Sequence, residues 1–142
     1  MPRIQPGPRK AHPSPKSESP PGAWEGRLRL WVVVNGRNAL GPGKVRLLEA
    51  IAATKSLSAA AKQLRMSYRL AWQHLRRIEE QTGIAVVEPR RGGPGGGGTD
   101  LTPQGSALLD AYHRFRHEVE EHVQSACHRH FTPWLSSDTS KT

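Results

Sequence analysis

Two short helical patterns separated by a tight turn constrain the fold of this 142-residue chain more than any other feature. The first covers residues 57–64 and the second residues 68–80, with residues 65–67 between them. Ser67 stands where it can accept a hydrogen bond from a free backbone amide and so begin the second helix. The predicted inward faces of the two helices consist of Ala60, Ala61, Leu64, Ala71, Leu75 and Ile78. Such spacing lets one helix brace the other across the turn, so the sequence predicts a helix-turn-helix.

Polar side chains recur along the opposite face of the second helix. Arg69, Gln73 and Arg76 are spaced by four and three residues, which places them on one outward-facing stripe. Arginine and glutamine match the edges of guanine and adenine in the major groove of DNA, and base contacts come from the start of such helices. The alternative is an amphipathic helix with a solvated basic face, the better interpretation of an isolated helix. The neighbouring segments favour the DNA-binding interpretation.

A hairpin with a long glycine-rich tip is predicted directly after this helix. Gly83 ends the helix, and residues 84–89 are short and β-branched enough to form a strand. Residues 92–98 are all glycine apart from Pro94, and residues 99–101 return as the partner strand. The hairpin and the helix-turn-helix together predict a winged helix, a mainly α fold with a small β component.

Two arginines stand at the base of the predicted wing. Arg90 and Arg91 would bind phosphate or enter the minor groove, and the glycines would let the backbone approach the duplex closely. A nucleotide-binding phosphate loop is disfavoured because the segment lacks the Gly-Lys-Ser/Thr ending. A plain linker would also account for the composition. However, Thr102 and Pro103 restart a helix at once with a cap and a first-turn proline, which favours a wing.

Several of these segments together resemble a known family. They are Met66–Trp72, the pair Val87-Glu88, residues 92–98 and Leu101–Gly105. These segments are similar to the N-terminal domain of ModE-type molybdate-responsive transcription regulators, which is itself similar to the winged-helix domain of LysR-type regulators. The resemblance covers roughly residues 27–123. It implies a sequence-specific transcription regulator linked to molybdate transport or molybdenum metabolism, which binds double-stranded DNA as a homodimer.

The sequence differs from ModE-type regulators in one respect. Full-length ModE-type regulators carry a C-terminal molybdate-binding region of two small β-barrels, whereas this sequence ends soon after its last predicted helix. We therefore expect no molybdate binding by this chain itself, and no cofactor. An alternative function follows, that of a sensor-less partner or antagonist that pairs with a full-length regulator, although the outward arginines and glutamine favour direct DNA reading. The predicted DNA-binding residues are Ser58, Ser67, Tyr68, Arg69, Trp72, Gln73, Arg76, Arg90 and Arg91.

Composition agrees with one small DNA-binding domain. The formal net charge of +9 and a pI near 10.6 favour a polyanionic partner. No apolar run approaches the length of a membrane span, and the mean hydropathy is −0.63, so we expect no membrane partner. The single cysteine, Cys127, rules out an intramolecular disulfide, and the N-terminus lacks the apolar core of a secretory signal; both fit a cytoplasmic protein. No arrangement of nucleophile, base and acid suggests catalysis, so we expect no enzyme.

The chain divides into three predicted parts. Residues 1–24 form a basic, proline-rich disordered tail, residues 25–130 form the winged-helix domain, and residues 131–142 form a second disordered tail. Within the domain, alternating apolar residues predict a strand over residues 27–34 that ends in an Asn35-Gly36 turn. An amphipathic helix follows, with an apolar face of Val45, Leu47, Leu48 and Ile51, and it ends at residues 54–56.

The last predicted helix, from Pro103 to about His130, is long for a domain of this size. Its apolar residues step by four and three in alternation and include the predicted dimerisation residues. The seam consists of Leu108, Tyr112, Phe115, Val119, His122 and Ala126, and all of these except His122 are the predicted dimerisation residues. One small domain cannot cover the whole seam, so we expect a homodimer. The alternative is that the seam packs on Leu28 and Leu30 of its own chain.

Histidines near the end of this helix raise the question of a metal site. His113 and His117 are one helical turn apart, and Cys127, His128 and His130 lie close together in sequence. No carboxylate ligand converges on them and no Cys-x-x-Cys pair is present, so we expect solvent-facing histidines and no metal.

Overall fold

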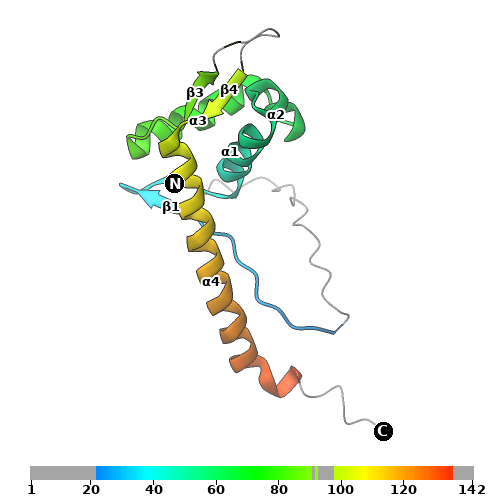
Figure 1. Cartoon of the computed structure of the whole chain (residues 1–142). Helices are drawn as coiled ribbons and strands as arrows, with labels where there is room; N and C mark the ends of the chain where they lie inside the picture. The colour runs from blue at the N-terminus through cyan, green and yellow to red at the C-terminus, as the bar shows by residue number, and fades with distance from the viewer. Residues whose placement is uncertain (1–21, 91, 93–97, 136–142) are drawn as a thin grey trace, which may run out of the picture.

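The computed structural model describes residues 22–90, 92 and 98–135. Along the chain these residues form β1 (Val32–Val34), β2 (Arg37–Leu40), α1 (Pro42–Thr54), α2 (Leu57–Gln63), α3 (Tyr68–Thr82), β3 (Val87–Arg90), β4 (Gly98–Leu101) and α4 (Pro103–Leu135). Figure 1 shows α1, α2, α3 and the β3–β4 hairpin gathered at one end of the molecule, with α4 leading away from them as a long rod. This is the predicted winged helix, mainly α with two small antiparallel hairpins.

The core lies where α1, α2 and α3 meet. Its largest fully buried side chains are Leu47, Leu48, Ile51, Ile78, Val45 and Val86. Burying one such side chain contributes about 1.5–3 kcal/mol, so these few residues supply much of the folding energy. Ala60 and Ala61 of α2 and Ala71 of α3 are also buried, and their small size lets the helices approach closely. The predicted inward faces of all three helices are confirmed, with Leu64 half-buried at the rim of the core.

The ends of α2 and α3 are fixed by local hydrogen bonds. The Ser56 Oγ atom accepts from the Ala59 amide at 3.1 Å and begins α2. The Ser67 Oγ atom accepts from the Leu70 amide at 3.0 Å and begins α3, as predicted. Gly83 ends α3 with a φ of 74°, a left-handed conformation that glycine adopts without strain. The geometry of the turn is therefore encoded locally.

The N-terminal hairpin differs from the prediction. The sequence pattern predicts a strand over residues 27–34, but β1 covers only Val32–Val34 and pairs with β2, which the pattern did not reveal. The turn between them is the predicted one, with φ of 51° at Asn35 and 78° at Gly36. A strand exists only where a partner supplies hydrogen bonds, and β2 offers just four residues before Gly41 and the start of α1.

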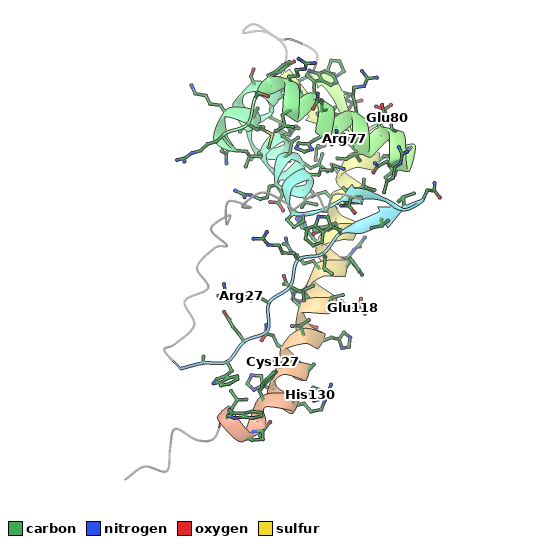
Figure 2. The ribbon with its side chains drawn as sticks, turned by 180° about the vertical axis from the view of Figure 1, so that it is seen from behind. Arg27, Arg77, Glu80, Glu118, Cys127 and His130 are labelled. Carbon is green, nitrogen blue, oxygen red and sulfur yellow. The ribbon has the colours of Figure 1, made fainter. Side chains whose placement is uncertain are left out.

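The extended residues 22–31 lie along α4 (Figure 2). The Gly26 amide donates to Gln124 Oε1 at 3.3 Å, and Gln124 Nε2 donates to the Gly26 carbonyl at 2.6 Å. Nearer the core, the Tyr112 hydroxyl donates to the Leu30 carbonyl at 2.9 Å. The apolar alternation of this segment therefore serves packing against a helix rather than strand pairing.

The far end of α4 corrects the predicted boundary of the domain. The prediction ends the helix near His130 and places a disordered tail after it, but the helix continues to Leu135. The Trp24 ring, which the prediction places in the N-terminal tail, lies 5.5 Å from Phe131 and 6.3 Å from Trp134 between ring centroids. This stacking gives the last turns of α4 an apolar partner. The rest of the two predicted tails, residues 1–21 and 136–142, lies outside the described residues.

Candidate nucleic-acid interface

The exposed face of α3 carries the side chains predicted to read DNA. Arg69, Gln73 and Arg76 are exposed, as predicted, while Leu75 and Ile78 on the opposite face are buried at 2% and 0% exposure. The helix is thus anchored on one side and presents a polar, cationic stripe on the other. Both guanidinium and carboxamide groups have the donor geometry for bidentate contacts with base edges.

Large apolar side chains flank this stripe. Tyr68 is 53% exposed and Trp72 is 43% exposed, although aromatic residues of this size are usually covered. Both belong to the first two turns of α3, on one side of Arg69 and Gln73. An aromatic side chain at the rim of a basic face can pack on a sugar or on a thymine methyl group. Their exposure fits a surface that is covered when a duplex binds.

Acidic residues mark the far limit of the stripe. Arg76 lies 3.9 Å from Glu80 as a surface pair one turn apart, with both side chains well exposed. Such pairs contribute only about 0.3–0.5 kcal/mol, so Arg76 can exchange Glu80 for DNA at little cost. Glu79 and Glu80 would repel phosphates, so the cationic stripe ends at Arg76, before these two carboxylates.

Two serines were also predicted to contact DNA. The Ser67 hydroxyl is engaged as the cap of α3, where it accepts from the Leu70 amide. Its hydroxyl proton remains available for a phosphate oxygen. Ser58 is exposed on the first turn of α2, next to the cap Ser56. The two serines therefore stand at the starts of the two helices of the motif.

The wing is a short antiparallel hairpin of β3 and β4. Its register pairs Val87 with Leu101 and Arg90 with Gly98, so the two strands pair as predicted, although β3 covers Val87–Arg90 and not the predicted residues 84–89. Arg90 is exposed at the end of β3. The second predicted contact, Arg91, and residues 93–97 of the tip lie outside the described residues.

The base of the wing is attached to the turn between α1 and α2. The Thr99 amide donates to the Lys55 carbonyl at 3.0 Å, and Lys55 Nζ lies 3.7 Å from Asp100 Oδ1. A side chain at Gly98 would overlap the Lys55 carbonyl oxygen, so only glycine allows this approach. Lys55 itself has a φ of 58° where α1 ends. These contacts fix the wing relative to the helix-turn-helix.

Sequence reasoning recognised the helix stop at residues 54–56 but missed Lys55 as the residue that positions the wing. A cation between two helices gives no signal of a contact with a strand more than forty positions away. Arg65 was also passed over; it is exposed in the helix-turn-helix turn with a φ of 55°. Among the described residues from the end of α1 to the end of β3, the exposed cations are Lys55, Lys62, Arg65, Arg69, Arg76, Arg77 and Arg90.

Two histidines of α4, His113 and His117, each pair with one carboxylate. His113 Nε2 lies 2.6 Å from Glu49 Oε1, and His117 Nε2 lies 3.1 Å from Glu121 Oε1. Among the described residues, no three His, Cys, Asp or Glu side chains come together as a metal site would require. Of the helices in the described ranges, none combines the length and apolarity needed to cross a membrane.

A known family model covers the elements that form this site. Residues 43–106 match the model of the bacterial regulatory helix-turn-helix proteins of the lysR family. This range begins in α1, contains the whole helix-turn-helix and the wing, and ends in the first turn of α4. A solved structure of the BenM DNA-binding domain with benA site 1 DNA is similar at a TM-score of 0.45 and 21% identity, covering 68% of this chain and 96% of that chain.

Curated relatives show higher identity. MopB of Rhodobacter capsulatus, named a molybdenum-pterin-binding protein, is 39% identical over 92 residues, which are 64% of this chain and 34% of that protein. The transcriptional regulator ModE of Haemophilus influenzae is 38% identical over 73 residues, 51% of this chain and 29% of that protein. The DNA-binding transcriptional dual regulator ModE of Escherichia coli K12 is 37% identical over 71 residues, 50% of this chain and 27% of that protein.

This chain spans 27–34% of the length of these relatives. The match to the lysR family model covers the elements that form the exposed stripe and the wing. Residues 43–106 therefore form a helix-turn-helix and wing that match the lysR family model, and the chain is similar in sequence to ModE transcriptional regulators.

Proposed function

We propose that this protein is a transcription regulator that binds double-stranded DNA sequence-specifically by placing α3 in the major groove. The observation that carries the proposal is the exposed stripe of Arg69, Gln73 and Arg76 on a helix whose other face is buried. Guanidinium and carboxamide groups held on a rigid helix can discriminate between bases, whereas a merely solvated basic face needs no such order. The wing would add phosphate contacts through Arg90.

The regulated genes, in this proposal, belong to molybdate transport or molybdenum metabolism. Support comes from the relatives, which are named for molybdenum or as ModE regulators and are 37–39% identical to this chain. A regulator of this kind acts on DNA in the cytoplasm and performs no catalysis.

A homodimer is the second part of the proposal. With 33 residues, α4 is about 50 Å long and extends well beyond the core. Residues 22–31 cover part of it, but Phe115 remains 44% exposed. Tyr112 is buried within its own chain, where its hydroxyl donates to the Leu30 carbonyl and burial raises the pKa of that hydroxyl. Leu108 packs partly buried against the core of its own chain, so the seam left for a partner subunit consists of Phe115, Val119 and Ala126.

Two-fold pairing through this seam would present two α3 helices to DNA. Half-sites read by such a dimer are separated by one helical turn, about 34 Å, or a multiple of it. The bound sequence should then be a pseudo-palindrome.

Selection of bound sequences from a pool of random duplexes tests the proposal. The purified protein should enrich one two-fold symmetric motif. A variant with Arg69→Ala and Gln73→Ala should lose the enrichment, while Arg114→Ala, which removes an exposed cation on α4, should retain it. Recovery of unrelated sequences by the wild type would contradict sequence-specific reading.

A further inference from the structure

A second cationic site lies on another flank of α3. A pocket with a volume of about 550 Å³ opens between the β1–β2 hairpin, the start of α1 and the second half of α3. Its polar lining comes from all three parts of the structure and consists of Arg37, Asn38, Lys44, His74, Arg77 and Gln81. The volume falls within the range of small-molecule sites.

The pocket gathers positive charge without a carboxylate in its lining. Arg37 comes from β2, Lys44 from α1 and Arg77 from α3. Within the described ranges, none of these three cations lies within 4.0 Å of an acidic side chain, whereas Lys55, Arg76 and Arg116 elsewhere do. Like charges held together in a concave surface repel one another and attract anions.

The titratable groups of the pocket show the cost of this crowding. The pKa of Lys44 is lowered first by burial and then by the charge of Arg77. The pKa of His74 is lowered by burial, then by Lys44 and then by Arg77. Lys44 Nζ donates to the Asn38 carbonyl at 2.8 Å, while His74 Nδ1 is buried with no hydrogen-bond partner among the described residues. An anion in the pocket would relieve the repulsion and could accept from these donors.

The pocket is distinct from the stripe that faces DNA. At 100° per residue, Arg77 lies 80° around α3 from Arg69, and His74 and Gln81 lie further round. Figure 2 labels Arg77 on α3, beside the labelled Glu80 that ends the DNA-facing stripe. The two sets of cations thus occupy neighbouring faces of one helix.

We propose that this pocket binds a small multivalent oxyanion, held by Arg37, Lys44 and Arg77, with His74 as an additional donor. Phosphate groups supply this chemistry, either as a free anion or as a backbone phosphate of bound DNA. The anion would tie the N-terminal hairpin to α3.

Calorimetric titration of the full chain with inorganic pyrophosphate tests the proposal. We expect one saturable site and at least a tenfold weakening in Arg37→Gln and in Arg77→Gln. The control Arg114→Gln removes the same charge from an exposed position on α4 and should bind like the wild type. Arg37 is exposed on the hairpin, so its variant keeps the test valid if Arg77→Gln fails to fold. Absence of saturable heat, or equal weakening in the control, would overturn the site.

Two further titrations identify the source of the anion. If it is a backbone phosphate of DNA, Arg37→Gln lowers the slope of log K against log salt for duplex binding by about 0.9, whereas a free anion leaves that slope unchanged. Molybdate is itself a dianionic oxyanion and is titrated alongside pyrophosphate. A saturable molybdate heat that Arg77→Gln abolishes would place molybdate in this pocket and correct the expectation that the chain does not bind it.

Discussion

Replacing Gly105 with alanine tests the packing that holds the wing base against α4. Gly105 is buried in the first turn of α4, and a Cβ atom there would lie 2.9 Å from Val86 Cα, 3.0 Å from the Val86 carbonyl carbon and nearer still to its oxygen. These are backbone atoms that cannot rotate away. The same junction holds the Thr102 amide on the Val86 carbonyl at 3.0 Å and the Gly105 amide on Thr102 Oγ1 at 2.9 Å.

Two effects oppose each other in Gly105→Ala. Helix propensity alone favours alanine by up to about 1 kcal/mol. Overpacking against fixed backbone costs about 1–3 kcal/mol, and a broken hydrogen bond at the junction adds about 1 kcal/mol. We therefore expect a net loss of about 1–3 kcal/mol in the free energy of unfolding, because the steric and hydrogen-bond losses outweigh the propensity gain.

Urea unfolding followed by circular dichroism measures this loss. The matched control is Gly43→Ala in the first turns of α1, where a Cβ atom would meet nothing within 4 Å. That variant should be neutral or more stable by up to about 1 kcal/mol. If Gly105→Ala proves as stable as the wild type, the close approach of α4 to Val86 is wrong.

Three more predictions concern the wing, His74 and the α4 seam. Neutralising Arg90 and Arg91 together should reduce the slope of log K for DNA binding against log salt by about 0.9 for each phosphate that the wing no longer binds. An unchanged slope would show that these two arginines do not contact DNA. Because burial and neighbouring cations lower the pKa of His74, the unfolded chain takes up its proton first as pH falls below 6.5; stability should drop there, and His74→Gln should flatten the profile in urea unfolding. Phe115→Asp with Val119→Asp would place unpaired carboxylates in the α4 seam and should abolish dimers in sedimentation, whereas a wild-type monomer at micromolar concentration would contradict the seam itself.

Periodic features of this fold could be predicted from the sequence. The three- and four-residue spacing of Ala71, Leu75 and Ile78 located the buried face of α3, and Ser67 and Gly83 located its ends. Each of these signals acts within a few residues of the chain, so composition and spacing are enough to reveal it.

Features set by tertiary packing could not be predicted. The alternation over residues 27–34 has the period of a strand, but residues 27–31 lie along α4, because β2 is too short to pair with the whole segment. The last turns of α4 contact Trp24, which lies more than a hundred residues earlier in the chain, and local spacing gives no signal of such a contact.

The same limit applies to the candidate site. The exposed stripe on α3 could be predicted, because Arg69, Gln73 and Arg76 are spaced by four and three residues. The attachment of Gly98 to the Lys55 carbonyl, and the gathering of Arg37, Lys44 and Arg77 around one pocket, arise only when distant elements pack.

Affinity measurements on duplexes changed at single base pairs test most directly whether Arg69 reads a base. Fluorescence anisotropy would compare wild type and Arg69→Ala on the selected duplex and on duplexes changed at single base pairs, with Arg114→Ala as the charge-matched control. We predict that Arg69→Ala loses about 1–3 kcal/mol of binding free energy on the selected duplex and no longer discriminates at one position, while the control keeps both. Equal losses on the selected duplex and on scrambled DNA would show that Arg69 touches only phosphate and would contradict base reading by this side chain.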